Sequence, residues 1–357
     1  MKNISNNVLI TGGAGFIGSH AAEFYAKSAE IDKVFVLDNL SRSNLLKRDI
    51  KNSLYNWDYL HQFQNINFLK NDIKDFKFLK QIFQENEFNI VIHTAAQTAV
   101  TTSVIDPISD FENNVTGTFN ILEAARVSKI NPIMILCSTN KVFGNNVNLC
   151  EIRETDSRYT FTEDNINGIS ENFSIDLCEH TPYGASKLSS DIYFQEYGHL
   201  YDLKTAVFRM SCIYGTRQFG VEDQGWVAHF ILSALTGKKL NIFGDGKQVR
   251  DVLYVSDLIE VYDAFIKKAD SIKHDVFCMG GGPENTLSLL ELIDILKKQI
   301  NKEIKYEFFD WRPSDQKVYI SNITKAMKKL DWKPKVKPKE GVLKLINWAS
   351  QNLHLFE

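Results

Sequence analysis

The feature that most restricts what this chain can fold into is a glycine-rich turn close to its first residue. An apolar stretch with β-branched residues at 8–11 is followed by GGAGFIG at 12–18 and then by a segment of helical character at 19–28. In such a turn the first glycine allows tight bending, the second lets the backbone approach a pyrophosphate, and the third lets the helix pack against the strand. The free N–H groups of the helix then face the phosphates. We expect the cofactor contacts of this turn to come from Gly12, Gly15, Phe16, Ile17 and Gly18.

The rest of the first half alternates short apolar runs with helical stretches. Strand-like segments are expected at 34–37, 66–69, 89–93 and 133–137, with an amphipathic helix at 114–128 and further strands at 204–208 and 276–279. Continuous apolar strands that alternate with helices predict an α/β fold with a Rossmann-type, doubly wound parallel sheet.

Two domains are expected. The cofactor domain should comprise residues 1–187, with later returns near 204–215 and 250–280. Residues 188–357, mainly 216–249 and 281–357, should form a smaller, mixed α/β C-terminal substrate domain. The polar stretch at 145–181 is too long for a simple connection and predicts an excursion near a functional site.

Asp38 at the end of the second expected strand bears on the choice of dinucleotide. It lies about 20 residues beyond the last motif glycine, where a carboxylate accepts hydrogen bonds from the adenosine ribose and repels a 2′-phosphate. This favours NAD over NADP. Arg42 is the competing feature, because a nearby arginine can hold a 2′-phosphate, and Asp38 could also be an ordinary loop carboxylate.

Tyr183 and Lys187 have the YxxxK spacing, which places both side chains on one face of a helix. A free tyrosine has a pKa of about 10, too high for a base at neutral pH. A nearby ammonium and the positive charge of an oxidised nicotinamide would stabilise the phenolate. Tyr183 could then take a proton from a hydroxyl while a hydride leaves the same carbon. Alone, the spacing is also compatible with a surface helix.

The composition of the chain limits the kinds of binding partner to expect. The net charge of −3 gives no support for a nucleic-acid footprint. The five cysteines show no metal-binding spacing, so no metal site is expected. The sequence has no run of about 18 apolar residues and its first residues do not resemble a signal peptide, which makes a membrane association unexpected and a cytoplasmic location the default.

Together, the motifs resemble those of the extended short-chain dehydrogenase/reductases of the nucleotide-sugar epimerase and dehydratase group. The resemblance covers nearly the whole chain. It rests on segments 11–20, 38–41, 71–73, 93–96, Asn114, 138–144, 183–187, 209–215, 244–251 and 312–315.

The resemblance implies roles for individual positions. Thr139 would be the hydroxyl-bearing third catalytic residue beside Tyr183 and Lys187, and the other implied residues fall into two sets. Further contacts to NAD are implied for Asn39, Ser41, Arg42, Asp72, Ile73, Ala95, Ala96, Gln97 and Asn114. Substrate contacts are implied for Thr139, Asn140, Gln224, Arg250, Arg312 and Asp315, although each arginine could instead form a structural ion pair. The group further implies a homodimer or homotetramer.

The segment after Thr139 separates the chemistries of the group. The 4,6-dehydratases have an Asp-Glu pair there, whereas this chain has Asn140 and Lys141. An amide is not a general acid, so elimination of water is disfavoured. This segment, together with residues 158–160, 217–219 and 223–227, resembles the CDP-paratose 2-epimerases.

That resemblance implies epimerisation at C2 of a CDP-3,6-dideoxyhexose in surface-sugar (polysaccharide) biosynthesis, with a CDP-sugar as substrate. The alternatives are a UDP-hexose 4-epimerase, a 4,6-dehydratase and a non-catalytic NAD-binding module. Cys212 departs from the group, in which many members have an asparagine that contacts the substrate phosphate.

Overall fold

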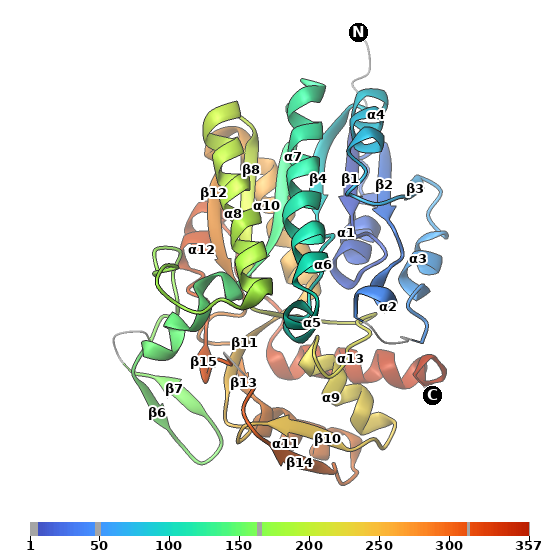
Figure 1. Cartoon of the computed structure of the whole chain (residues 1–357). Helices are drawn as coiled ribbons and strands as arrows, with labels where there is room; N and C mark the ends of the chain where they lie inside the picture. Colours follow the sequence, from blue (N-terminus) through green and yellow to red (C-terminus); the bar gives the residue numbers. More distant parts are fainter. Residues whose placement is uncertain (1–5, 47–50, 163–165, 313–314, 357) are drawn as a thin grey trace. The chain divides into compact units, whose positions relative to one another are not determined.

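The computed structural model describes residues 6–46, 51–162, 166–312 and 315–356. Its largest sheet has seven strands in the order β12-β8-β5-β4-β1-β2-β3 (Figure 1). The strands are β1 (Asn7–Thr11), β2 (Lys33–Asp38), β3 (Ile66–Lys70), β4 (Phe88–His93), β5 (Ile133–Thr139), β8 (Lys204–Met210) and β12 (Asp275–Met279). Pairing is parallel from β3 through β5, and the strand order reverses between β1 and β4. In such sheets ligands bind at this switch point. The expected Rossmann-type sheet is confirmed.

Burial on both faces explains why these segments are strands rather than helices. All five residues of β1 are buried, as are four of the six in β2. Helices α4, α7 and α8 share one hydrophobic core with the sheet, and α1 and α10 lie on its far side in Figure 1. These helices are α1 (Phe16–Ala26), α4 (Phe76–Asn86), α7 (Gly117–Ser128), α8 (Thr181–Tyr201) and α10 (Val255–Ile272).

The helix expected at 114–128 differs in its first turn. It is preceded by α5 (Val100–Ile105), α6 (Pro107–Phe111) and a π-helical segment, Glu112–Thr116, that runs directly into α7. Asn114 lies inside this π segment and is buried. Wider π turns are uncommon and occur frequently at functional sites. Short helices α2 (Arg42–Leu45) and α3 (Tyr55–Leu60) follow β2.

The chain divides into two compact units. The first comprises residues 1–139, 182–208 and 259–276, and the second comprises residues 140–181, 209–258 and 277–357. In the second unit a four-stranded sheet surrounds β11, and separate pairs are formed by β10 with β14 and by β6 with β7. These strands are β6 (Ile152–Glu154), β7 (Tyr159–Phe161), β9 (Cys212–Tyr214), β10 (Leu240–Phe243), β11 (Val249–Tyr254), β13 (Thr286–Ser288), β14 (Tyr306–Phe309) and β15 (Val318–Tyr319).

Two of the helices described in the second unit, α11 and α13, carry clear local start signals. They are α9 (Trp226–Leu235), α11 (Leu289–Ile300), α12 (Thr324–Leu330) and α13 (Pro338–Gln351), with 3₁₀ segments at Asn140–Leu149 and Leu353–Leu355. Ser288 and Glu291 form a reciprocal capping box at the start of α11. Pro338 occupies the first turn of α13, where a missing N–H costs nothing.

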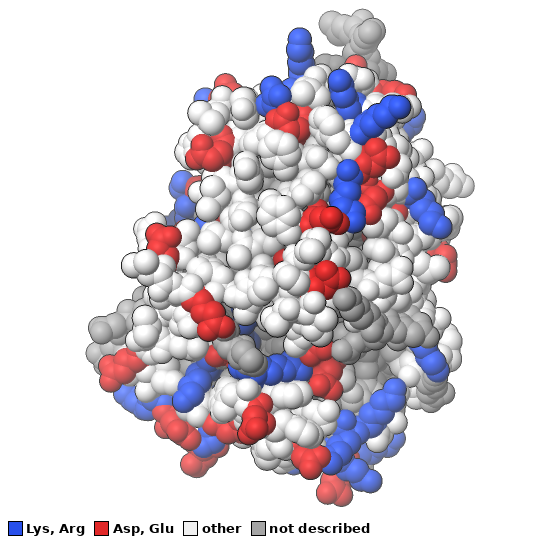
Figure 2. All heavy atoms as spheres, in the orientation of Figure 1, with Lys and Arg blue, Asp and Glu red and all other residues white. Residues whose placement is uncertain are grey.

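The surface over α7 and α8 has few charged side chains, as Figure 2 shows in the orientation of Figure 1. Large apolar side chains lie exposed on these two helices, among them Phe119, Ile192, Tyr193 and Leu200. Phe119 and Tyr193 pack edge to face, with ring centroids 5.6 Å apart. These exposed side chains are called the apolar face of α7 and α8 below.

None of the described helices is long and apolar enough to cross a bilayer. Within the same residues, no group of three His, Cys, Asp or Glu side chains is arranged to hold a metal ion.

Candidate active site

The glycine turn between β1 and α1 closes tightly on itself. Gly12 has a φ of 68°, and a Cβ there would lie 2.6 Å from the backbone nitrogen of Ala95. A Cβ on Gly18 would lie 2.3 Å from the carbonyl oxygen of Gly12. In the described structure no side chain caps the first turn of α1. The turn thus presents backbone N–H groups at a helix N-terminus, which fits the pyrophosphate of a dinucleotide.

Asp38 is linked directly to this turn. Its Oδ2 accepts the N–H of Ala14 at 3.0 Å, and its Oδ1 accepts the N–H of Leu40 at 2.8 Å. Burial raises the pKa of Asp38, and both backbone bonds oppose that increase. Burial lowers the pKa of Arg42 to about 10, so its guanidinium stays charged at neutral pH. Asp38 is therefore hydrogen-bonded to the turn, and Arg42 begins α2 four residues further along the chain.

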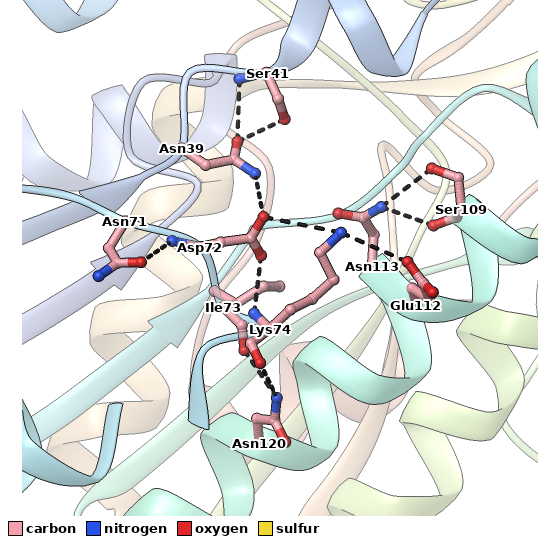
Figure 3. Close-up of polar contacts among 10 residues, drawn as sticks. All are labelled: Asn39, Ser41, Asn71, Asp72, Ile73, Lys74, Ser109, Glu112, Asn113 and Asn120. Atoms are coloured by element: carbon pink, nitrogen blue, oxygen red, sulfur yellow. Dashed lines mark hydrogen bonds and ion pairs between the residues drawn. The ribbon is translucent and has the colours of Figure 1, made fainter. Parts of the chain in front are cut away.

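The expected adenine end is a connected polar cluster (Figure 3). Asn39 donates to Oδ2 of Asp72 at 2.9 Å, and the Ser41 hydroxyl donates to Oδ1 of Asn39 at 2.6 Å. The side-chain amide of Asn120 donates to the carbonyl oxygens of Ile73 and Lys74 at 3.1 and 3.2 Å. Three of the predicted cofactor residues, Asn39, Ser41 and Asp72, therefore form one network.

Thr139, Tyr183 and Lys187 come together in the first unit. Thr139 is the last residue of β5, and the other two lie in the first two turns of α8, with Tyr183 9% and Lys187 3% exposed. The backbone N–H of Tyr183 donates to the Ser103 hydroxyl at 3.1 Å. The helix that the YxxxK spacing requires is present, and both side chains are buried rather than on the surface.

Burial dominates the titration of this pair. It raises the pKa of Tyr183 to about 12; a hydrogen bond with Thr139 lowers that pKa, and Asp110 and Cys137 raise it. Burial also lowers the pKa of Lys187, against the opposing effects of Cys137, Asp191 and Asp110. A phenolate at neutral pH therefore needs further positive charge, which an oxidised nicotinamide would supply when bound.

His93, at the end of β4, serves a structural role beside this site. Its two ring nitrogens lie 2.6 Å from the Thr11 hydroxyl and 2.9 Å from the Thr118 hydroxyl. Burial, with a smaller effect of Lys187, lowers the pKa of His93 to about 3. The imidazole is therefore neutral and is not a proton carrier near neutral pH.

In the second unit Arg250, Asp315 and Gln316 form one cluster. The Arg250 guanidinium lies 2.7 Å from Oδ1 of Asp315 and donates to the Gln316 carbonyl oxygen at 2.6 Å. Asn140 donates its amide to Oε1 of Gln316 at 3.0 Å, and Gln316 in turn donates to the carbonyl oxygen of Gly144 at 3.0 Å. The expected substrate residues Asn140, Arg250 and Asp315 are thus brought together.

Arg312 lies in a different cluster of the same unit. Its guanidinium stacks over the Phe243 ring at 3.9 Å and forms an ion pair with Asp223 at 2.9 Å. Glu222 lies 3.5 Å from the same guanidinium. Gln224 forms a tight backbone turn with Val221 before α9. Pro313 and Ser314 of the predicted RPSD motif lie outside the described residues.

Several polar residues near these sites were not predicted as site residues. Gln316 and Glu222 contact the predicted substrate residues, and Asp110 and Ser186 lie beside the catalytic pair. Asp110 and Asn114 share a four-residue helical spacing, which is the one sequence signal that could have indicated Asp110. The contacts of Gln316 span 176 residues and leave no local pattern.

Comparison with known proteins identifies the class. Residues 9–345 match the family model described as GDP-mannose 4,6 dehydratase, and the chain belongs to this family of extended short-chain dehydrogenase/reductases. It is 40% identical to CDP-paratose 2-epimerase of Salmonella typhi over 96% of this chain and 99% of that protein. UDP-glucuronate 4-epimerase of Thermodesulfobacterium geofontis is 31% identical, with 98% of each chain covered.

Solved structures agree with this assignment. UDP-glucuronic acid 4-epimerase of Bacillus cereus, solved with UDP-glucuronic acid and NAD, has a TM-score of 0.78 at 26% identity and covers 97% of this chain and 99% of that one. dTDP-glucose 4,6-dehydratase of Bacillus anthracis, solved with NAD, has a TM-score of 0.76 at 26% identity and covers 98% of both chains. The predictions of the family, of an enzyme and of NAD as cofactor are confirmed.

Proposed function

We propose that this chain is a nucleotide-sugar epimerase that inverts C2 of a CDP-linked 3,6-dideoxyhexose, as between CDP-paratose and CDP-tyvelose. The observation that carries the proposal is the amide of Asn140, directly after Thr139, paired with the amide of Gln316. The 40% identity to a CDP-paratose 2-epimerase over nearly the full length of both chains supports the choice of carbon and base.

The proposed chemistry uses the three residues that the first unit brings together. Tyr183, as phenolate, takes the proton of the sugar hydroxyl, and Thr139 hydrogen-bonds the same oxygen. Lys187 stabilises the phenolate and holds the nicotinamide ribose. Bound NAD would supply the acceptor for the hydride of the same carbon and the source from which that hydride returns. Once the keto-sugar has rotated so that its opposite face receives the hydride, Tyr183 gives the proton back to the oxygen. No net redox change results.

The Asn140–Gln316 pair supports epimerisation over elimination of water. The Gly144 carbonyl oxygen can only accept, so the Gln316 amide nitrogen must face it and Oε1 must face Asn140. Asn140 therefore has to present its NH₂ group. Neither amide can protonate a leaving hydroxyl, whereas a carboxylic acid at this position could.

The binding of the diphosphate is assigned to Arg250 and Arg312. Planar guanidinium groups suit phosphate oxygens because two N–H groups can bind at once. Without substrate, each guanidinium forms an ion pair within the second unit, Arg250 with Asp315 and Arg312 with Asp223. We propose that the phosphates share these guanidiniums rather than replace the carboxylates.

The isotopic fate of the C2 hydrogen tests the proposal. CDP-paratose or CDP-tyvelose is incubated with the NAD-loaded enzyme in D₂O, and the product is analysed by NMR. We expect the C2 epimer with protium retained at C2, because the hydride returns to the carbon it left. Deuterium at C2 would indicate direct deprotonation and overturn the NAD mechanism.

A second candidate is a UDP-hexose 4-epimerase. It is supported by the 31% identity to UDP-glucuronate 4-epimerase. The same Thr139, Tyr183 and Lys187 would act on a sugar seated with C4 at the site. Inversion at C4 of UDP-glucose or UDP-glucuronic acid, with no action on CDP-sugars, would replace the first proposal.

The elimination alternative has its own test in Asn140→Asp. We expect the variant still to form only the epimer, with turnover reduced by about tenfold, because a carboxylate facing Oε1 of Gln316 leaves a buried acceptor without its donor. Asn285→Asp is the matched control: Asn285 is a buried amide of the same unit whose NH₂ donates to the Gly281 carbonyl oxygen at 2.8 Å. Elimination of water needs a sugar that still has its 6-hydroxyl, so CDP-glucose is offered as a second substrate. A 4-keto-6-deoxy product from Asn140→Asp would show that residue 140 alone decides between the reactions.

We further propose that the chain forms a homodimer or homotetramer through the apolar face of α7 and α8. Contiguous exposed apolar side chains on a folded protein mark interaction sites. Tyr193→Glu would place a charge in the centre of this face and should give a monomer by light scattering. An unchanged mass for Tyr193→Glu would exclude this face.

A further inference from the structure

Asp110 is a buried carboxylate beside the catalytic pair to which the chemistry above gives no task. It lies in α6 and is 1% exposed. Its Oδ1 accepts the side-chain amides of Gln97 at 2.9 Å and of Asn114 at 3.2 Å. Its Oδ2 is buried, and the Ser186 hydroxyl also stabilises the charged carboxylate. A buried charged group is costly unless its surroundings compensate it, so this carboxylate requires an explanation.

The neighbours of Asp110 lead directly to Tyr183 and Lys187. The Asn114 amide also donates to the Ser186 hydroxyl at 2.9 Å, and that hydroxyl donates to the Tyr183 carbonyl oxygen at 3.1 Å. Asn114 lies in the π-helical segment, whose wider turn follows Asp110 immediately. Oδ1 of Asn114 accepts the backbone N–H of Gln97 at 2.8 Å. One amide thus joins Asp110 to the first turns of α8.

Charge provides the second connection. Burial raises the pKa of Asp110, while Ser186, Gln97 and the Lys187 ammonium lower it. The acidic groups around Lys187 are Cys137, Asp191 and Asp110. The Cys137 thiol is neutral near pH 7, since burial raises its pKa to about 11. The two carboxylates therefore carry the counter-charge.

The two carboxylates differ in their effect on Tyr183. Asp191 lies on α8, one turn after Lys187. Its Oδ2 accepts a hydrogen bond from the Ser138 hydroxyl at 2.9 Å, and its Oδ1 accepts one from the Gln195 amide at 2.7 Å. Asp110 acts on Tyr183 as well as on Lys187, because its charge raises the pKa of both. Asp110 is thus the carboxylate that couples the two catalytic groups.

We propose that Asp110 is a positioning residue of this active site: its Oδ1 anchors the amide of Asn114, which in turn holds the Ser186 hydroxyl against the first turn of α8, and its negative charge acts on the catalytic pair from that position. The proposal rests on the assignment of Tyr183 and Lys187 as the catalytic pair under the proposed function. Asp110 touches neither substrate nor cofactor in this role and acts through its neighbours.

Asp110→Asn separates the charge from the hydrogen bonds. Both amide donors converge on Oδ1, so an asparagine with its carbonyl oxygen at that position still accepts both. The negative charge is lost, together with the interaction of the carboxylate with the Ser186 hydroxyl. Asp191→Asn is the matched control, because it removes an equally buried negative charge beside Lys187.

The test is a pH titration of Tyr183 in the NAD-loaded enzyme, followed as tyrosinate absorbance. Each variant is compared with the same variant carrying Tyr183→Phe, so that the difference reports Tyr183 alone. In Asp110→Asn we expect the Tyr183 titration to move to lower pH by about 1 unit, because a like charge close to the phenolate is removed. In Asp191→Asn it should stay at the wild-type position. A wild-type titration in Asp110→Asn would overturn the proposal.

The pH dependence of kcat provides the second measurement. Tyr183 must be ionised and Lys187 protonated, which gives a profile with an acid and an alkaline limb. Loss of the Asp110 charge lowers both pKa values, so the whole profile should move to lower pH. Asp191→Asn should move the alkaline limb alone. Equal pH profiles for the two variants would contradict the proposal, because Asp110 would then have no effect on Tyr183 that Asp191 lacks.

Two further arrangements keep the test decisive. The absorbance titration needs no sugar, so it tests the proposal about Asp110 even if the enzyme converts no nucleotide sugar. Failure to convert any nucleotide sugar would count only against the proposed function. Should Asp110→Asn not fold, Asp110→Ser is a smaller neutral acceptor with the same expected shift. Circular dichroism and NAD content establish folding for each variant.

Discussion

The expected cofactor site and the expected substrate site of this protein are built from different parts of the chain. In the first unit the glycine-rich turn expected to bind NAD is made by backbone: a left-handed glycine, a close approach to Ala95 and an uncapped helix N-terminus. In the second unit the expected substrate residues are side chains paired with one another, Arg250 with Asp315 and Arg312 with Asp223. A backbone site depends on a few adjacent residues, whereas a side-chain site depends on partners distant in sequence.

The largest expected effect concerns the chemistry held by the first unit. Tyr183→Phe removes the group that exchanges the proton, so kcat should fall by about 10²-fold or more while NAD content stays near normal. Tyr197→Phe is the matched control: Tyr197 is a second buried tyrosine on α8, and its hydroxyl donates to Glu123. Near-normal turnover of Tyr183→Phe would place the chemistry elsewhere.

The next effect tests whether the NAD turn really depends on backbone. In Gly18→Ala the added Cβ would meet the Gly12 carbonyl oxygen at 2.3 Å, and relief of that overlap has to open the turn. Overpacking of this kind costs about 1–3 kcal/mol, so NAD affinity should fall by about tenfold or more. Gly237→Ala serves as the control: at a φ of 70° it strains the backbone of the second unit, but its Cβ would meet nothing within 4 Å, so stability should fall while NAD affinity stays unchanged. Isothermal titration calorimetry measures the NAD affinity of each variant. An unchanged affinity for Gly18→Ala would contradict the proposal that NAD binding depends on the closely packed backbone of the turn.

The same contrast explains what the sequence could predict. The seven strands of the large sheet and the Tyr183–Lys187 helix lie where the sequence predicts them, and the glycine turn follows the first strand as expected, because strand burial and helical spacing are local properties. The π segment at Glu112–Thr116 was not predicted, since the amphipathic pattern of a helix is nearly the same across one widened turn. The capping box of Ser288 and Glu291 does have a local signature, a serine three residues before a glutamate at the start of an apolar run.

The substrate side was predicted by resemblance rather than by pattern. Asn140 meets Gln316 across 176 residues, and Arg250 meets Asp315 across 65. Pairs at such distances in sequence are set by the tertiary fold, so spacing alone cannot indicate them. The roles of these residues toward a substrate, the cytoplasmic location and the two-domain boundaries stay predictions.

A smaller effect tests whether the arginines bind substrate or only stabilise the second unit. Arg250→Ala removes one of two proposed phosphate ligands, and KM for the nucleotide sugar should rise by about tenfold with NAD content unchanged. Lys247→Ala is the control, because Lys247 forms a 2.7 Å ion pair with Glu154 in the same unit. If thermal stability falls in Arg250→Ala while KM stays constant, the ion pair with Asp315 is structural.

The smallest expected effect is an opposite pH dependence of stability in the two units. Burial lowers the pKa of His93 in the first unit to about 3, below its ordinary value, so the native state binds fewer protons than the unfolded state. The stability that the neutral imidazole contributes is complete above pH 6.5 and is lost as the pH falls toward 3. Burial raises the pKa of Asp251 in the second unit to about 6, so here the native state binds more protons. That contribution is complete below pH 3.8 and is lost as the pH rises through 6.

Between pH 4 and 6, amide exchange corrected for its intrinsic rate should therefore slow in β4 and quicken in β11 as the pH rises, by at most about tenfold per pH unit for one proton. His93→Asn should flatten the first slope and Asp251→Asn the second, each without changing the other. Parallel slopes in the two units would show that they unfold as one and that this contrast between them does not extend to stability.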